Sequence, residues 1–162
     1  GNVSVESIVK VAKNFGGVEH RIEFVREVDG VRWYNDSIAT SPTRVIAGLN
    51  SFNQKIIIIA GGYDKKIPFE PLAKPINERV KILILMGATA DKIEKAVTEC
   101  PYYPESGLKI VHVKSMEEAV LTANKISDDG DIVSLSPACA SFDMYPMFEA
   151  RGNHFKKLVN EL

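Results

Sequence analysis

The sequence predicts an α/β fold, in which a mostly parallel β-sheet carries helices on both faces. Four runs that are apolar almost throughout, "KIIIIAGG", "KILILMG", "LKIVHV" and "DIVSLS", have the length and composition of buried strands. Segments with the apolar spacing of helices follow these runs in alternation, as parallel sheets require. Upstream of them, an Asp-Gly pair separates two alternating runs, which is the usual signal of a β-hairpin.

The first third of the chain predicts two helices and the hairpin between them. Residues 4–15, "SVESIVKVAKNF", have helical apolar spacing with Ser4 as a cap. "RIEFVREV" and "VRWYND" flank Asp29-Gly30, where glycine accepts the positive φ of a two-residue turn. We expect this hairpin to supply an antiparallel strand at one edge of the sheet. Residues 41–52, "SPTRVIAGLNSF", predict a helix that Ser41 caps.

The rest of the chain repeats a strand-then-helix pattern. "KIIIIAGG" precedes a Pro-interrupted helix at residues 69–79, and "KILILMG" precedes the helix "ADKIEKAVTEC". "LKIVHV" leads to "SMEEAVLTANKIS", a helix opened by a capping box of Ser115 and Glu118. "DIVSLS" is the last strand, and residues 148–161 are the last helix. The alternation is typical of a Rossmann-like sheet, and we expect residues 1–162 to form one domain.

Composition restricts the class of partner and the compartment. The chain of 162 residues is 45% apolar and 25% charged, with a formal net charge of −1. This balance argues against nucleic acid or an anionic membrane as the main partner. The apolar runs are too short to cross a bilayer, and "GNVSVESIVK" does not open like a signal peptide. Cys100 and Cys139 lack a CxxC spacing, which fits a reducing cytoplasm and predicts neither disulfides nor a zinc site.

Small and hydrogen-bonding residues follow several of the predicted strands, and ligands of such sheets bind at the carboxyl ends of strands. Gly61-Gly62 with Lys65 offers close backbone approach and a cation, which suits a carboxylate or a phosphate. A tight turn with a solvated lysine explains the same residues equally well. The stretch matches neither the Walker A loop nor GxGxxG.

Polar residues also crowd the start of the helix predicted at 41–52. Ser41 explains the cap, whereas Asp36, Ser37 and Thr40 lie where exposed backbone N–H groups favour an anion. Asp36 is a candidate for holding a sugar hydroxyl or a metal. Without further information a capping or surface role is favoured for it.

Residues 135–152, "LSPACASFDMYPMFEARG", hold too many Pro, Ser and Phe residues for a plain connector, and predict a loop that lines a ligand site. Cys139 is expected to be a small buried thiol, because no nearby histidine is indicated. Arg151 is either on the helix surface or reaches back to the loop. No triad, carboxylate dyad or metal cluster is indicated.

Three segments, "HRIEFV…GVRWYNDSIATSP", "IIIIAGGYDKK" and "SPACASFDMYPMFEARGNHFK", together resemble the C-terminal domain of Mur ligases, and most of all the members that add D-glutamate. The resemblance covers nearly the whole chain after Ser4. One departure is Ile38, where many members carry lysine. The resemblance implies a three-domain ATP-dependent ligase of peptidoglycan precursor synthesis. Its UDP-binding domain and its central ATPase domain, which holds the P-loop and the magnesium ligands, are expected outside this chain.

Carried onto this sequence, the resemblance implies residue roles but no catalytic or metal-binding residue in this domain. The implied D-glutamate contacts are Thr40, Lys65, Ser141 and Phe148, the last through its backbone. The implied nucleotide contacts are Arg21 and Asp36, with Asp36 on the ribose, and with His20 and Asn35 as secondary candidates. The implied partners are D-glutamate, ATP with Mg2+, and UDP-N-acetylmuramoyl-L-alanine, used by a cytoplasmic monomer. The chain alone is expected to be inactive.

Three alternatives stay open at this point. The first is the C-terminal domain of another Mur ligase or of a folylpolyglutamate-type ligase, and the "PACAS" segment argues against it. The second is a stand-alone Rossmann-like nucleotide-binding module, against which the absence of GxGxxG counts. The third is a scaffold or interaction protein, and no feature of the sequence supports it.

Overall fold

The structure is a computed structural model that describes residues 17–162. Its strands are β1 (Glu23–Val28), β2 (Val31–Asn35), β3 (Ile56–Ala60), β4 (Val80–Leu85), β5 (Lys109–His112) and β6 (Ile132–Leu135). Its helices are α1 (Pro42–Leu49), α2 (Glu70–Arg79), α3 (Ala90–Thr98), α4 (Tyr103–Ser106), α5 (Met116–Ile126) and α6 (Phe148–Asn160). The helix predicted at residues 4–15 lies outside the described residues.

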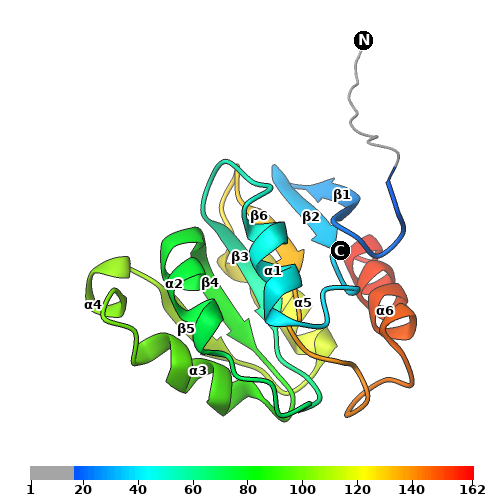
Figure 1. Cartoon of the computed structure of the whole chain (residues 1–162). Helices are drawn as coiled ribbons and strands as arrows, with labels where there is room; N and C mark the ends of the chain where they lie inside the picture. The colour runs from blue at the N-terminus through cyan, green and yellow to red at the C-terminus, as the bar shows by residue number, and fades with distance from the viewer. Residues whose placement is uncertain (1–16) are drawn as a thin grey trace.

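The strands form one sheet in the order β1-β2-β6-β3-β4-β5 (Figure 1). Strand β1 is antiparallel to β2, and every other neighbouring pair is parallel. This confirms the predicted mostly parallel sheet with the hairpin at one edge. The last strand of the chain, β6, lies in the middle of the sheet between β2 and β3.

The hairpin turn has the backbone that its Asp-Gly pair predicts. Asp29 has a φ of 51° and Gly30 a φ of 79°, which is the left-handed pair of a type I′ turn. The turn sets Val28 opposite Val31 and directs Trp33 into the core, where it is fully buried. Burial of Trp33 against Phe155 of α6 fixes which face of the hairpin points inward.

Helices cover both faces of the sheet, as the all-apolar strands require. On one face Ile56, Ile58 and Ala60 of β3 pack in a core with α1, α2 and α3. On the other face Ile57 and Ile59 pack in a second core with α5 and α6. Alternate residues of one strand therefore serve the two cores, and Ile56 to Ile59 are each at most 1% exposed.

The two helix N-termini predicted at Ser115 and Ser41 are present, but only one of these serines caps its helix through the side chain. Ser115 accepts a hydrogen bond from the backbone N–H of Glu118 (3.0 Å), which confirms that cap, and the Glu118 carboxylate accepts from the N–H of Lys114. Ser41 has the extended backbone of an N-cap, but its hydroxyl makes no capping bond in the described chain. The four-residue helix α4 was not predicted, because one turn is too short to show periodicity.

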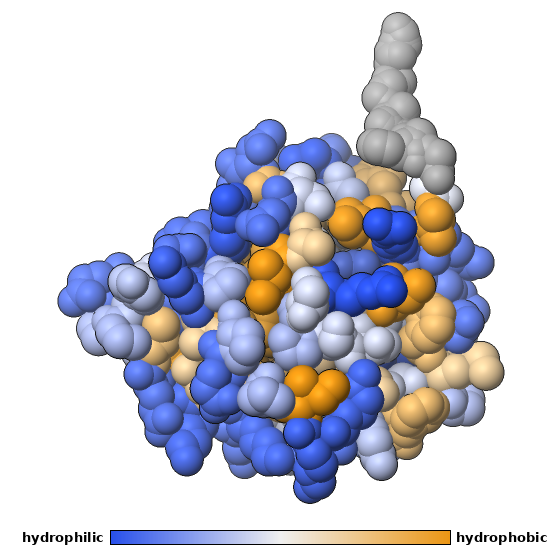
Figure 2. Space-filling view, in the orientation of Figure 1, coloured by the Kyte–Doolittle hydropathy of each residue, from blue (hydrophilic) through white to orange (hydrophobic). Residues whose placement is uncertain are grey.

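The outer surface offers few apolar areas on the face drawn in Figure 2, where hydrophilic side chains predominate and apolar ones form small separate groups. Five large apolar side chains on the loops at the carboxyl ends of β3 and β6 are exposed: Tyr63, Ile67, Phe142, Met144 and Met147. Among residues 17–162, no helix combines the length and the apolar character needed to span a membrane.

Candidate ligand site at the carboxyl ends of three strands

Three loops meet at one edge of the sheet, because β2, β6 and β3 are neighbours and end on the same side. They are residues 36–41 after β2, residues 61–69 after β3 and residues 136–147 after β6. Backbone hydrogen bonds join them: the Ala138 N–H donates to Ala39 O, and the Gly61 N–H donates to Pro137 O, each at 2.9 Å. The sequence prediction that residues 135–152 line a site is consistent with this position.

The glycines of the second loop are required by its close packing. Gly61 has a φ of 110°, and a Cβ at this position would lie 1.9 Å from the carbonyl oxygen of Met86. A Cβ on Gly62 would lie 2.6 Å from the carbonyl oxygen of Ala140. Lys65, three residues further on, is exposed. The loop is therefore held tightly at its start and presents a cation to solvent at its middle.

Among the residues predicted to bind D-glutamate, Ser141 gives the strongest structural support for a ligand site. Its side chain is 2% exposed, and its hydroxyl has no hydrogen-bond partner within residues 17–162. A buried polar group without a partner costs about 1–3 kcal/mol, so such groups are rare unless a ligand supplies the partner. The Ser141 hydroxyl therefore has hydrogen-bonding capacity left for a ligand or a water molecule.

Phe148 is the first residue of α6, and Met147, the residue before it, makes no side-chain cap in the described structure. The backbone N–H groups of a first turn have no partner inside the helix and lie at its positive end, which suits a carboxylate. The Phe148 carbonyl accepts a hydrogen bond from the Ser37 hydroxyl (2.7 Å). Half-buried Thr40 lies near the end of the first loop, so Thr40 and Phe148 both border the same three-loop junction.

Arg151 supports the junction from inside, a role that the sequence left open. It is 1% exposed, and its Nε and Nη2 donate to the hydroxyl (3.0 Å) and to the carbonyl (2.9 Å) of Ser37. Its Nη1 has no hydrogen-bond partner in residues 17–162. Burial lowers the pKa of Arg151 to about 10, so the guanidinium stays charged at neutral pH. Arg151 thus reaches back to the loop after β2 and does not lie on the helix surface.

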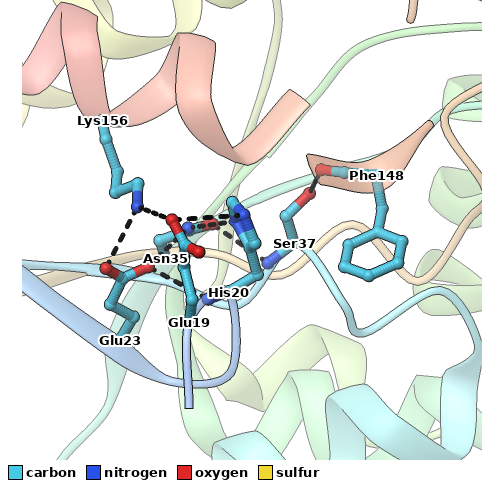
Figure 3. A network of polar contacts seen from close by, with 7 residues as sticks. All are labelled: Glu19, His20, Glu23, Asn35, Ser37, Phe148 and Lys156. Atoms are coloured by element: carbon cyan, nitrogen blue, oxygen red, sulfur yellow. Dashed lines mark hydrogen bonds and ion pairs between the residues drawn. The ribbon is translucent and has the colours of Figure 1, made fainter. Parts of the chain in front are cut away.

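His20 and Asn35 lie in a polar network between the hairpin and α6, shown in Figure 3. The Asn35 amide nitrogen is 2.9 Å from Nδ1 of His20 and 3.1 Å from Oε1 of Glu23. Lys156 of α6 donates to Glu23 and to Glu19, which ties the helix to the start of β1 and to the segment before it. His20 has a φ of 67° and is 4% exposed, so the network holds the backbone beside Arg21 in an uncommon conformation.

Asp36 is buried, so its favoured sequence interpretation as a capping or surface residue was wrong. Its carboxylate is 4% exposed, and Oδ1 accepts a hydrogen bond from the Ile22 N–H (3.1 Å). Burial raises the pKa of Asp36 to about 7, and the Ile22 N–H, Arg21 and Arg44 oppose that rise. The contact joins the loop after β2 to the segment that carries exposed Arg21. Sequence spacing gives no sign of it, because the two segments are brought together by the hairpin.

We expect Asp36→Asn to be more stable than the wild type at neutral and alkaline pH. A carboxyl whose folded pKa lies above its unfolded value stabilises the fold when protonated, and this contribution is lost as the pH rises from about 4 through about 7. Asparagine keeps an oxygen for the Ile22 N–H and does not ionise. Urea denaturation at pH 5 to 8 should show a gap between variant and wild type that grows to about 2–4 kcal/mol. The exposed Asp129→Asn serves as the control, and equal pH profiles for Asp36→Asn and wild type would refute the expectation.

Cys139 is a neutral, buried thiol, as the sequence predicted. It is 1% exposed, and its Sγ lies 3.2 Å from the hydroxyl of Thr89. Burial raises the pKa of the Cys139 thiol to about 11, so it is protonated at neutral pH and is a poor nucleophile.

A group with metal-ligand chemistry lies at the β5 edge of the sheet, where the sequence indicated none. Asp91, Glu94 and His112 each place one donor atom within 4.8 Å of the others. Glu94 Oε1 and His112 Nε2 already pair at 2.8 Å on the surface. We assign this group no ligand.

The description "Mur ligase, glutamate ligase domain" belongs to a family model that matches residues 20–139. A curated relative from Clostridium botulinum (strain Kyoto / Type A2), named UDP-N-acetylmuramoylalanine--D-glutamate ligase, is 61% identical over 99% of this chain. A relative of the same name from Clostridium acetobutylicum is 58% identical over 99% of the chain. The chain spans 35% of the length of each of these relatives.

Solved structures share the fold at low sequence identity. A murein peptide ligase from Psychrobacter arcticus 273-4 has a TM-score of 0.59 at 13% identity, covering 90% of this chain and 31% of that chain. A folylpolyglutamate synthase from Mycobacterium tuberculosis complexed with ADP has a TM-score of 0.61 at 11% identity, covering 86% of this chain and 32% of that chain. With the family match over residues 20–139 and the fold in agreement, this chain belongs to the Mur ligase family, as a glutamate ligase domain.

Proposed function

We propose that this chain is the C-terminal, amino-acid-binding domain of an ATP-dependent ligase that joins D-glutamate to UDP-N-acetylmuramoyl-L-alanine in peptidoglycan precursor synthesis. The observation that carries the proposal is about 60% identity, over 99% of the chain, to relatives that bear the name of this ligase. Residues 1–162 form one domain in this proposal, and the UDP-binding and ATPase domains belong to other parts of the full-length enzyme.

The proposed D-glutamate pocket combines one cation with neutral donors, which is what a dicarboxylate needs in a partly dry site. Lys65 supplies the cation, Thr40 and Ser141 supply hydroxyls, and Phe148 supplies the backbone N–H at the start of α6. Thr40, Lys65 and Ser141 come from the three joined loops, and Phe148 begins the helix that follows the third loop. The orphan hydroxyl of Ser141 supports the assignment, because a substrate carboxylate would complete its hydrogen bonding.

The proposed nucleotide contacts lie beside the hairpin, and their chemistry fits ATP. Arg21 is exposed and carries the charge that a phosphate attracts. A Cβ on Gly48 of α1 would lie 2.9 Å from Oδ2 of Asp36, so glycine at this position leaves room for the buried carboxylate that is proposed to hold the ribose. His20 and Asn35 hold the backbone of this segment. Mg2+ is proposed to be held by the ATPase domain.

In this proposal ATP supplies the phosphoryl group that activates the carboxylate of UDP-N-acetylmuramoyl-L-alanine. The pocket of this chain fixes D-glutamate through its carboxylates, so that its amine is free to attack the activated carbonyl carbon. Holding the amine in place converts a bimolecular step into an effectively unimolecular one. Closing the domain over the site also removes water, which would otherwise hydrolyse the acyl phosphate.

We expect the isolated chain to release no phosphate from ATP in the presence of D-glutamate and UDP-N-acetylmuramoyl-L-alanine, because it contributes only one wall of each site. A phosphate-release assay on the isolated chain tests the domain assignment, and the same assay on the full-length ligase tests the substrate assignment. The full-length enzyme should turn over with D-glutamate and not with L-alanine in its place. Turnover by the isolated chain would contradict the domain assignment, and full-length activity with L-alanine alone would contradict the substrate assignment.

A further inference from the structure

Thr89 joins the Lys65 loop to the Ser141 loop from a third direction. It directly precedes α3, at the carboxyl end of β4, and its side chain is fully buried. Its hydroxyl oxygen accepts a hydrogen bond from the Gly62 N–H (3.0 Å) and lies 3.2 Å from the Cys139 sulfur. One hydroxyl thus contacts both loops whose residues are proposed to grip D-glutamate.

The Gly62 contact completes the attachment of the loop after β3. The N–H groups on either side of it, those of Gly61 and Tyr63, donate to Pro137 O and Ala140 O at 2.9 Å. The N–H groups of Gly61 and Tyr63 therefore donate to residues 136–140, and the N–H of Gly62 between them donates to Thr89. The loop is thus fixed on both sides just before Lys65. Only the Thr89 bond uses a side chain, so a single substitution can remove it.

The chemistry of Cys139 makes Thr89 a suitable bridge. The thiol is protonated, so its S–H has the Thr89 oxygen within reach as an acceptor, and that oxygen has two lone pairs to share with Gly62. A second hydrogen bond joins the loop after β4 to the loop after β6, because the Ala88 N–H donates to the Asp143 carboxylate at 3.1 Å. The loop after β4 is thus attached to both sides of the proposed pocket without touching the proposed substrate contacts themselves.

We propose that Thr89 is a positioning residue, which sets the separation between Lys65 and Ser141 and thereby the grip on the two carboxylates of D-glutamate. The proposal rests on the proposed function of the pocket. Without the hydroxyl, the buried Gly62 N–H loses its acceptor, and the loop must shift to reach another one. A displacement of about 1 Å at a positioning element is enough to lower the efficiency of an enzyme substantially.

The kinetic test uses the full-length ligase with Thr89→Val, which keeps the shape of the side chain and removes the hydroxyl. We expect the KM for D-glutamate to rise about tenfold and the KM for ATP to change less than about twofold. Thr89→Ser, which restores the hydroxyl, should return the KM for D-glutamate to within about threefold of wild type. Thr98→Val is the matched control, because the Thr98 hydroxyl donates to Glu94 O within α3 and not to either loop.

A second readout on this chain is independent of activity. Amide hydrogen exchange should accelerate at Gly62 in Thr89→Val and stay at the wild-type rate in Thr98→Val. An unchanged KM for D-glutamate in Thr89→Val, or equal increases for D-glutamate and ATP, would overturn the positioning role. If Thr89→Val fails to fold, Thr89→Ala and Thr89→Ser carry the same comparison. A wild-type ligase that does not use D-glutamate would overturn the proposed function instead, and Gly62 exchange alone would then decide whether Thr89 holds the loop.

Discussion

In the full-length ligase, Lys65→Ala is expected to lower kcat/KM for D-glutamate by roughly thirtyfold to several thousandfold. Lys65 is the exposed cation of the loop after β3, and its loss would leave a substrate carboxylate without its partner. Removing one member of a desolvated charge pair costs about 2–5 kcal/mol, which corresponds to that range. Steady-state kinetics with varied D-glutamate and with varied ATP measures both parameters.

Lys66→Ala is the matched control, because Lys66 is the neighbouring lysine and already pairs with Asp64 (3.7 Å). It should leave kcat/KM for D-glutamate within about threefold of wild type, since surface ion pairs contribute about 0–1 kcal/mol. Asp36→Ala should show the reverse pattern to Lys65→Ala, with the larger change in the KM for ATP. If Lys65→Ala raised only the KM for ATP, the two proposed pockets would have been exchanged.

Arg151→Met is expected to lower the free energy of unfolding of this chain by about 2–3 kcal/mol. Methionine keeps the apolar stem, but the carbonyl and hydroxyl of buried Ser37 lose their charged donor. Hydrogen bonds to charged groups contribute about 1.5–3 kcal/mol each, and release of the desolvated charge offsets part of that sum. Urea denaturation at neutral pH measures the change.

Two further variants separate this effect from a loss of bulk. Arg151→Lys keeps the charge but not the fork that reaches both Ser37 oxygens, so it should recover only part of the stability. Arg79→Met removes a guanidinium that donates to Phe52 O at 3.3 Å from a half-buried position, where water can replace it, so this variant should cost about 1 kcal/mol or less. Wild-type stability in Arg151→Met would mean that the buried arginine does not hold the loop after β2.

The sequence predicted the sheet correctly because its strands carry two strong and independent signals. "IIIIA" is apolar on both faces and "VKILIL" is so except at Lys81, a pattern that indicates a strand covered by helices on both sides. The Asp-Gly turn sets the hairpin by local chemistry alone, as the φ angles of Asp29 and Gly30 confirm. The order of the strands is not a local property, so the position of β6 inside the sheet was not predicted.

The candidate site was predicted less completely, because its supports depend on burial by distant segments. Arg151 and Ser37 are 114 positions apart, and Thr89 and Cys139 are 50 apart. No sequence spacing predicts contacts between residues so far apart, and each residue alone is typical of an ordinary helix or loop. Asp36 was misjudged for the same reason, since Ile22 reaches it only after the hairpin forms. The proposed roles of Thr40, Lys65, Ser141 and Phe148 stay predictions.

The central place of β6 has a consequence for how the chain reaches its folded state during synthesis. Among residues 17–162, strand β6 alone joins the hairpin to β3 in the sheet, and it ends at Leu135. Until that residue has left the ribosome, the hairpin and the β3-β4-β5 half have no shared hydrogen-bonded ladder. Closing a loop of about one hundred residues to pair β2 with β6 is entropically expensive, and pairings so distant along the chain slow folding. The strand that comes last among the described residues is therefore the one that makes two partial sheets into a single sheet.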